Sequence, residues 1–277
     1  MSGKGIYDIH CHIVPGVDDG ATDIEETGKL LRMEYEQGVR TIIATPHFRF
    51  RMFETSAEKV KEQFKLVEKA AAEVASDLHV YLGCEFHTNM EMISMLRENK
   101  VMTMAGSRYV LTEFSHNSEE NYIRERLSAL LSGGYKPIVA HIERYEATRT
   151  SMDFVEELVD MGVCMQINAD SITGKDGFFT KRYCNRVMKQ DLLHFVGSDC
   201  HNSTKRISRI GEAYRVVTAK FGQDYADELF IRNPERILVM SFYLHSIWLL
   251  WLCHVVLLLE MILIRYQVHP LLQPIDF

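Results

Sequence analysis

The chain has 277 residues, of which 47% are hydrophobic and 25% are charged, and its formal net charge is −7. This length and this balance are those of a globular protein that buries a sizeable core, in one large α/β domain or two small ones. Because basic residues are outnumbered and are not clustered along the chain, the composition gives no electrostatic footprint for nucleic acid.

Strand-like and helical segments alternate from the start of the chain. An apolar run over residues 6–9 predicts a first strand, and Asp23 with the acidic residues after it predicts the start of a helix that ends at Gly38. Further strands are predicted at residues 39–44, 81–82, 110–111, 138–139, 164–168 and 195–196. Further helices are predicted at residues 56–76, 90–97, 119–131, 151–161, 181–189 and 207–220.

Seven strand–helix units in alternation predict a parallel sheet. An open doubly wound sheet gathers its ligand at one switch point, whereas six of the seven predicted strand ends here carry His, Asp or Glu side chains. We therefore expect an α/β fold with a closed or nearly closed barrel, formed as one domain by residues 1–240.

Residues 241–277 differ sharply in character. Residues 244–264 are apolar over a length that spans a bilayer, but His245, His254 and Glu260 interrupt them and Arg265 is almost the only basic flank. Three interpretations stay open: a membrane helix, an apolar helix packed on the barrel or on a partner, and out-of-frame sequence.

The N-terminus and the cysteines indicate a cytoplasmic protein, membrane-associated if the apolar tail is a true helix. Residues 1–4 lead into the first strand without the apolar core of a signal peptide. None of the six cysteines forms a C-x-x-C pair, and two lie inside metal-type motifs. A reducing compartment fits this usage better than a disulfide framework.

The side chains at the strand ends predict a polynuclear metal site. His10 and His12 are two residues apart and therefore point to the same face of a strand, and Asp199 and His201 repeat this spacing. In a parallel barrel all such ends converge on one face, and imidazoles with carboxylates suit Mn²⁺, Fe²⁺ or Zn²⁺. The other candidates that follow strand-like runs are His47, Glu85, Glu113 and His141.

Residues 8–21 read Asp-Ile-His-Cys-His-Ile-Val-Pro-Gly-Val-Asp-Asp-Gly-Ala. This string resembles the first motif of the bacterial protein-tyrosine phosphatases of the PHP (polymerase and histidinol phosphatase) superfamily, which act in capsule and exopolysaccharide synthesis. Later motifs match in order: Ala-Thr-Pro-His at 44–47, Gly-Cys-Glu at 83–85, Ala-His-Ile-Glu-Arg-Tyr at 140–145, and Ser-Asp-Cys-His-Asn at 198–202 with Arg206. The resemblance covers residues 5 to about 238. Ile142 stands where proline is common and Cys200 where alanine is usual, and neither departure removes a ligand.

The resemblance implies a distorted (β/α)7 TIM-like barrel, the PHP fold, to which the tail would add an apolar C-terminal helix. It also implies three divalent metal ions, most readily Mn²⁺, with Fe²⁺ or Zn²⁺ as alternatives. His10, His12, Glu85 and Asp199 would hold the first ion. Asp18 or Asp19 would hold the second with His47 and His201, and Glu113 with His141 would hold the third, with Glu85 bridging.

The implied reaction is hydrolysis of phosphotyrosine by a metal-bound hydroxide, on a bacterial tyrosine autokinase as the protein partner. Arg144 and Arg206 are candidates for bidentate contacts with the phosphate oxygens. Cys200 and Arg206 also fit the C-x5-R pattern of cysteine phosphatases, but residues 201–205 contain no glycine with which to fold a phosphate cradle. We therefore favour the metal mechanism.

Other interpretations remain open at this stage. The same metal core would serve a small-molecule phosphomonoesterase such as histidinol phosphatase, and an inactive binding protein tethered through residues 244–264 belongs to another functional class. Phe48, Phe50, Phe53 and Tyr145 would either form a rim around a substrate tyrosine or cap the barrel. A homo-oligomer is also compatible with the sequence.

Overall fold

The computed structural model of the chain describes residues 5–241, so the predicted tail segment 244–264 lies outside the described residues. Within this range the fold is α/β, and every pair of neighbouring strands is parallel. The strands are β1 (Ile6–Cys11), β2 (Val39–Ala44), β3 (His47–Phe48), β4 (His79–Leu82), β5 (Glu85–His87), β6 (Tyr109–Glu113), β7 (Lys136–Val139), β8 (Cys164–Asn168) and β9 (Phe195–Gly197).

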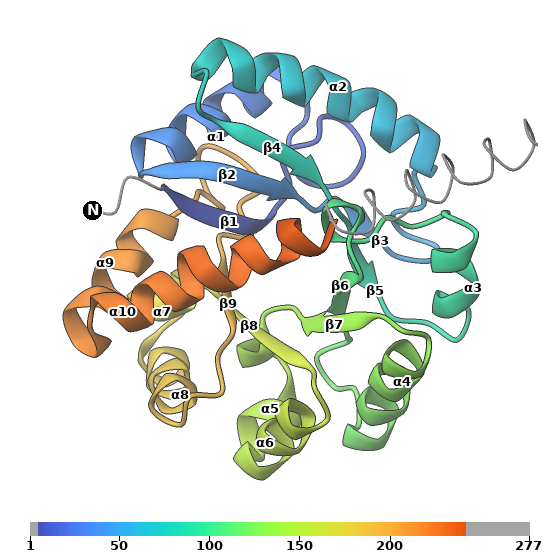
Figure 1. Cartoon of the computed structure of the whole chain (residues 1–277), viewed down its shortest axis with the longest axis vertical. Helices are drawn as coiled ribbons and strands as arrows, with labels where there is room; N and C mark the ends of the chain where they lie inside the picture. Colours follow the sequence, from blue (N-terminus) through green and yellow to red (C-terminus); the bar gives the residue numbers. More distant parts are fainter. Residues whose placement is uncertain (1–4, 242–277) are drawn as a thin grey trace, which may run out of the picture.

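The strands form two sheets, in the orders β1-β2-β4 and β3-β5-β6-β7-β8-β9. Backbone hydrogen bonds join them at both ends. The Gly83 N–H, after β4, donates to the Ala44 carbonyl (2.7 Å) in β2, and the Glu85 N–H donates to the Pro46 carbonyl (3.1 Å), so the pairing of β2 with β4 runs on into that of β3 with β5. The Asp199 N–H donates to the His10 carbonyl (2.7 Å), which brings the chain after β9 beside β1. The parallel sheet therefore curls round on itself (Figure 1).

The predicted strands 39–44 and 81–82 are present as β2 and within β4, and each is followed by a short strand that was not predicted, β3 or β5. Pro46 has no N–H to donate, so the hydrogen-bond ladder breaks between β2 and β3. Gly83 and Cys84 separate β4 from β5, although the Gly83 N–H still donates to the Ala44 carbonyl (2.7 Å). Each interruption turns the chain so that a ligand candidate, His47 or Glu85, begins the second segment.

Helices surround the curled sheet (Figure 1). They are α1 (Ile24–Glu36), α2 (Ala57–Val74), α3 (Met92–Arg97), α4 (Glu120–Ser132), α5 (Glu146–Thr150), α6 (Met152–Asp160), α7 (Ala169–Thr173), α8 (Phe178–Lys189), α9 (Ile210–Phe221) and α10 (Gln223–Asp227). The short α5, α7 and α10 were not predicted, because one or two turns carry little periodicity. Among the described residues no helix is both long and apolar enough to cross a bilayer.

The sequence explains the boundaries of the long helices. The Asp23 carboxylate accepts from the Glu26 N–H (2.9 Å) and caps α1, and Gly38, with φ of 96°, lets the chain turn from α1 into β2. In α2, Val60, Phe64 and Val67 form a buried stripe. Each such side chain contributes about 1.5–3 kcal/mol on burial.

The inside of the curled sheet has an apolar cluster that is covered at one end. Ile9, Ile43 and Ile138 pack there with Ile237, which lies on the last described helical stretch, residues 233–241. The Asn233 side chain donates to the His194 carbonyl (3.0 Å), directly before β9, so this stretch covers the N-terminal ends of the strands. The C-terminal ends remain free to build a site.

Candidate metal centre

Four predicted residues meet at the C-terminal ends of β1 and β9 and the start of β5. His10 Nε2 and His12 Nε2 lie 3.3 Å apart. Glu85 Oε2 lies 3.1 Å from His10 Nε2 and 3.3 Å from His12 Nε2. Asp199 Oδ1 lies 3.7 Å and 3.4 Å from the same two nitrogens. All four side chains are buried, so their donor atoms face one shared space.

This spacing fits a single cation. Ligand atoms about 2.1 Å from a tetrahedrally coordinated ion lie about 3.4 Å from one another, which matches the separations above. Two imidazoles and two carboxylates are a donor set suited to Mn²⁺, Fe²⁺ or Zn²⁺. Glu85 Oε2, Glu113 Oε2 and His201 Nε2 are also buried without a hydrogen-bond partner. Burying such atoms costs free energy unless a ligand satisfies them.

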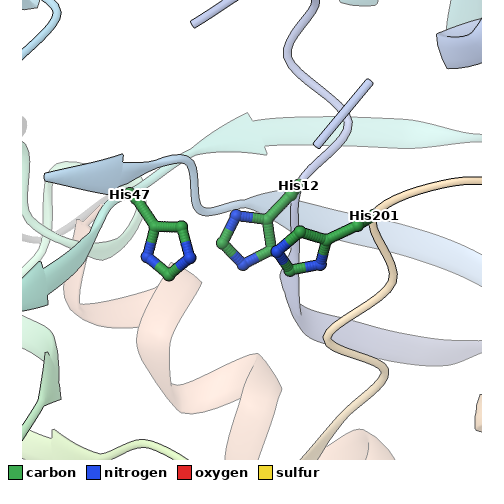
Figure 2. A group of neighbouring side chains, drawn as sticks. All are labelled: His12, His47 and His201. Carbon is green, nitrogen blue, oxygen red and sulfur yellow. The ribbon is translucent and has the colours of Figure 1, made fainter. Parts of the chain in front are cut away.

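A second group lies beside the first. His12, His47 and His201 place their rings together (Figure 2), with the rings of His12 and His201 stacked at 3.8 Å between centroids. Asp19 Oδ1 lies 3.6 Å from both His47 Nε2 and His201 Nε2. Asp18 is placed differently: its carboxylate accepts from His12 Nδ1 (2.8 Å) and from the His47 N–H (2.8 Å). Asp19 thus faces the second group, whereas Asp18 orients His12.

The third predicted set also converges. His141 Nε2 lies 2.7 Å from Glu85 Oε1 and 3.9 Å from Glu113 Oε1. His47 Nδ1 lies 3.0 Å from Glu85 Oε2 and 4.0 Å from Glu113 Oε2. Glu85 is therefore the carboxylate shared by the neighbouring groups.

Protonation in the centre follows from burial and charge. Burial by itself lowers the pKa of a histidine. The Glu85 carboxylate nevertheless holds the pKa of His10 above its ordinary value, and the Asp18 carboxylate holds that of His12 well above it. Burial acts to raise the pKa of Glu85, yet the surrounding histidines hold it well below its usual range. The buried carboxylates therefore favour protonation of His10 and His12, and a cation that binds there competes with those protons.

The pKa values of His141, His201 and Glu113 are shifted mainly by burial. Burial lowers the pKa of both His141 and His201 to about 4, so both imidazoles are neutral at pH 7, which is the form that binds metals. Burial, together with the charge of Glu85, raises the pKa of Glu113 to about 7. The positive backbone φ of His141 (34°) and Asp199 (54°) shows that the chain is strained at two candidate ligands.

Several residues that hold the candidate ligands in place were missed in the sequence. Gln166 Oε1 accepts from the His141 N–H (2.7 Å), and the Asn168 side chain donates to Asp199 Oδ2 (2.8 Å). Both lie on β8, the one predicted strand without a candidate at its end. Their i, i+2 spacing in an apolar strand was the available signal, because it places two polar side chains on one face.

Of the two interpretations left open for Tyr145, a substrate rim or a cap on the barrel, the rim does not fit its burial. Tyr145 is fully buried, and its hydroxyl lies 3.1 Å from His141 Nδ1 and accepts from the Phe114 N–H (3.2 Å). Phe53 stacks on the His47 ring at 5.2 Å, and Phe50 is 58% exposed. Phe48 packs edge-on against the buried Phe86, so the aromatic set divides between support of the histidines, core packing and exposed surface.

The two predicted arginines lie at the rim of the centre. Arg144 Nη2 lies 2.9 Å from Asp199 Oδ2, and Arg206 Nη2 lies 3.2 Å from Asp199 Oδ1. Arg206 Nη1 also lies 3.5 Å from Asp19 Oδ2. Both guanidinium groups are partly exposed, so each has donors left for a substrate anion.

Cys200 does not face this rim. It is fully buried, and its thiol donates to Glu34 Oε1 (3.7 Å) in a separate group with Asp8. Cys200 lies between Asp199 and His201 beyond the end of β9, and its side chain points away from theirs, toward Glu34. The geometry therefore gives Cys200 no position from which to attack a phosphate held by Arg206.

Comparisons with known proteins agree on one group of relatives. The family described as "Capsular polysaccharide synthesis, CpsB/CapC" matches residues 6–239. The tyrosine-protein phosphatase CpsB of Streptococcus pneumoniae is 40% identical over 239 residues, which cover 84% of this chain and 98% of that protein. The tyrosine-protein phosphatase YwqE of Bacillus subtilis is 32% identical over 233 residues, covering 84% and 91%.

Solved structures give the same result for the fold. A structure from work on YwqE of Bacillus subtilis and CpsB of Streptococcus pneumoniae, described as metal-dependent tyrosine phosphatases, superposes with a TM-score of 0.79. It is 32% identical and covers 84% of this chain and 94% of the other. The phosphotriesterase homology protein of Escherichia coli, at 12% identity and a TM-score of 0.55, shares the fold alone.

Proposed function

The chain belongs to the capsular polysaccharide synthesis family CpsB/CapC, and we propose that it is a metal-dependent protein-tyrosine phosphatase. The observation that carries this proposal is the buried four-donor group of His10, His12, Glu85 and Asp199, with Arg144 beside it. Relatives that match this chain over 98% of their own length are named tyrosine-protein phosphatases. A metal-binding group and a rim of arginines are the two parts that phosphate ester hydrolysis requires.

We propose that the centre holds three divalent ions, with Mn²⁺ the first choice. His10, His12, Glu85 and Asp199 would bind the first ion, as their mutual distances support. His47, His201 and Asp19 would bind the second, with Asp18 orienting His12 from behind. Glu113, His141 and the shared Glu85 would bind the third.

The chemistry then divides between the cations and the protein. Bound divalent cations lower the pKa of water and polarise the phosphoryl oxygens. Arg144 and Arg206 orient the phosphate, because each guanidinium presents planar donors beside Asp199. Tyr145 and Gln166 hold His141 in a fixed orientation. The tyrosine phenolate has an ordinary pKa of about 10, so it leaves with modest help from a general acid.

The number of strand positions in the barrel, the cellular location and the substrate are part of the same proposal. β3 follows β2 and β5 follows β4 after only two residues each, and counting each succession as one strand position supports a barrel with seven strand positions in a domain of residues 1–240. Five cysteines within the described residues are free and buried, which supports a reducing, cytoplasmic location. The substrate would be a phosphotyrosine protein of the capsule system, such as a tyrosine autokinase.

The test compares two substrates on the full chain. We expect hydrolysis of a phosphotyrosine peptide, its loss on chelation and its recovery on addition of Mn²⁺. Histidinol phosphate is the matched comparison, because a metabolite phosphatase with the same metal core would prefer it. Preference for histidinol phosphate would contradict the protein-phosphatase proposal, and equal activity with and without chelator would contradict the metal proposal.

A further inference from the structure

The outer surface of the barrel carries a groove between α8 and the end of α9, with a volume of about 490 Å³. It is lined by Phe178, Asn185 and five cationic side chains: Lys181, Arg182, Arg186, Lys189 and Lys220. No carboxylate lines it. The basic residues of the chain are not clustered in the sequence, but the helical repeat places those of α8 on one face, and the fold adds Lys220 from α9.

The charge of this groove is uncompensated. Among the described residues, no carboxylate lies within ion-pairing distance of Arg182, Arg186, Lys189 or Lys220. Attraction to the C-terminal end of a helix accounts for Arg186 and Lys189 on α8 and for Lys220 on α9, but it does not account for Lys181 or Arg182. The chain has a net charge of −7, so the groove is a positively charged region on a protein that is negatively charged as a whole.

The groove begins near the metal centre. The first turn of α8 follows α7, which is anchored where the Ser171 hydroxyl donates to Glu143 Oε1 (2.8 Å), next to Arg144. α8 also contacts the short 3-10 turn Ile142–Arg144. At this end Phe178 and Phe179 are 72% and 77% exposed. The groove therefore lies along a helix that contacts the Ile142–Arg144 turn, which carries one of the rim arginines.

On the basis of the proposed function, we propose that this groove binds an acidic segment of the phosphotyrosine protein, separate from the phosphotyrosine itself. The cations would attract its carboxylates, and Phe178 with Phe179 would pack against its apolar side chains. The 12 residues of α8 extend over about 18 Å, which an extended segment of about five or six residues covers. The concave shape favours a chain segment over a bilayer, because a flat membrane surface would contact only the rims of the groove and not the residues at its base.

The test neutralises the groove without touching the metal centre. The variant carries Arg182→Gln, Arg186→Gln and Lys220→Gln. The matched control carries Lys61→Gln, Lys65→Gln and Lys69→Gln, three exposed cations on α2 with the same change in net charge. Both variants are expected to keep the thermal unfolding midpoint and the kcat for para-nitrophenyl phosphate of the parent protein.

Two peptides measure the effect on catalysis. One joins phosphotyrosine to a block of six glutamates through a flexible spacer, and the other has six glutamines in their place. For the acidic peptide, the groove variant should raise KM about tenfold, equivalent to about 1.4 kcal/mol, with kcat unchanged. The glutamine peptide and the control variant should show no change. Equal KM values for the two peptides on the parent protein would overturn the proposal.

A binding measurement keeps this inference separate from the phosphatase activity. A fluorescent peptide with six glutamates and no phosphotyrosine should bind the full chain in a salt-dependent manner, and the groove variant should bind it about tenfold more weakly. This result is expected whether or not the protein proves to be a phosphatase. Preferential loss of binding to phosphatidylglycerol vesicles or to a single-stranded oligonucleotide would instead assign the groove to one of those ligands and overturn the proposal.

Discussion

Replacement of Arg144 tests how the centre holds phosphate. The Arg144 guanidinium lies 2.9 Å from Asp199 and is 35% exposed, so it has donors free for a second anion. A hydrogen bond to a charged group contributes about 1.5–3 kcal/mol. Arg144→Lys keeps the charge but loses the second, parallel donor. We therefore expect kcat/KM to fall about 10-fold to 150-fold, and Arg144→Ala to lower it further.

The assay measures kcat/KM for para-nitrophenyl phosphate and for a phosphotyrosine peptide, with metal content determined for each variant. Because Arg144 would contact the phosphate shared by both substrates, both should lose activity by the same factor. Arg97→Lys, an exposed residue on α3, is the matched control and should leave kcat/KM unchanged. Full activity of Arg144→Lys with unaltered metal content would refute the role given to Arg144. Loss of metal would instead assign the effect to Asp199.

Three further results are expected. Cys200→Ser should keep most of the activity, because the thiol is buried away from the arginines, whereas chelation should abolish activity; the opposite pair of results would revive the cysteine mechanism. Tyr145→Phe should weaken metal binding about 10-fold to 100-fold, since His141 loses its hydroxyl partner, and unchanged affinity in a metal titration would contradict this. The raised pKa values of His10 and His12 stabilise the fold fully below the ordinary histidine pKa of about 6.5 and progressively less as the pH rises through the raised values. The unfolding midpoint of metal-stripped protein should therefore fall as the pH rises above about 6.5, and should not fall in this way when metal is bound; a rise in the stripped protein would show that the sign is wrong.

Much of the fold and of the candidate site could be predicted from the order of the motifs along the chain. His10 and His12 were identifiable because two histidines with this spacing at a strand end must share a face. Asp199 lies far along the chain, yet parallel strands bring all C-terminal ends together, and its carboxylate does lie within 3.7 Å of His10. The sequence therefore predicted which residues form the candidate site and that they meet at the C-terminal ends of the strands.

The separate roles of Asp18 and Asp19 could not be predicted, because two identical neighbouring side chains differ only in the direction that the loop gives them. Gly20 sets that direction: a Cβ at this position would lie 2.2 Å from the His12 carbonyl oxygen, so only glycine lets the loop approach β1 this closely. The buried Asp18 carboxylate then accepts from the Gly20 N–H (2.9 Å) and turns toward His12.

Two other features depended on tertiary structure. The break between β2 and β3 follows from the missing N–H of Pro46 and was visible in principle. The groove along α8 was not visible, because Lys220 is 34 positions from Arg186 in the printed sequence and joins it only when α9 packs beside α8. Patches that draw on two helices follow from packing, and periodicity within one helix cannot reveal them.

The metal content of the purified, active chain tests the central claim most directly. Elemental analysis alongside activity should find about three divalent ions per chain in active protein and a parallel loss of ions and activity on chelation. Replacement of Glu85 by glutamine should lower the count, because this carboxylate is shared by neighbouring groups. Active protein that contains no divalent ion, or activity that persists after complete removal of metal, would contradict the account.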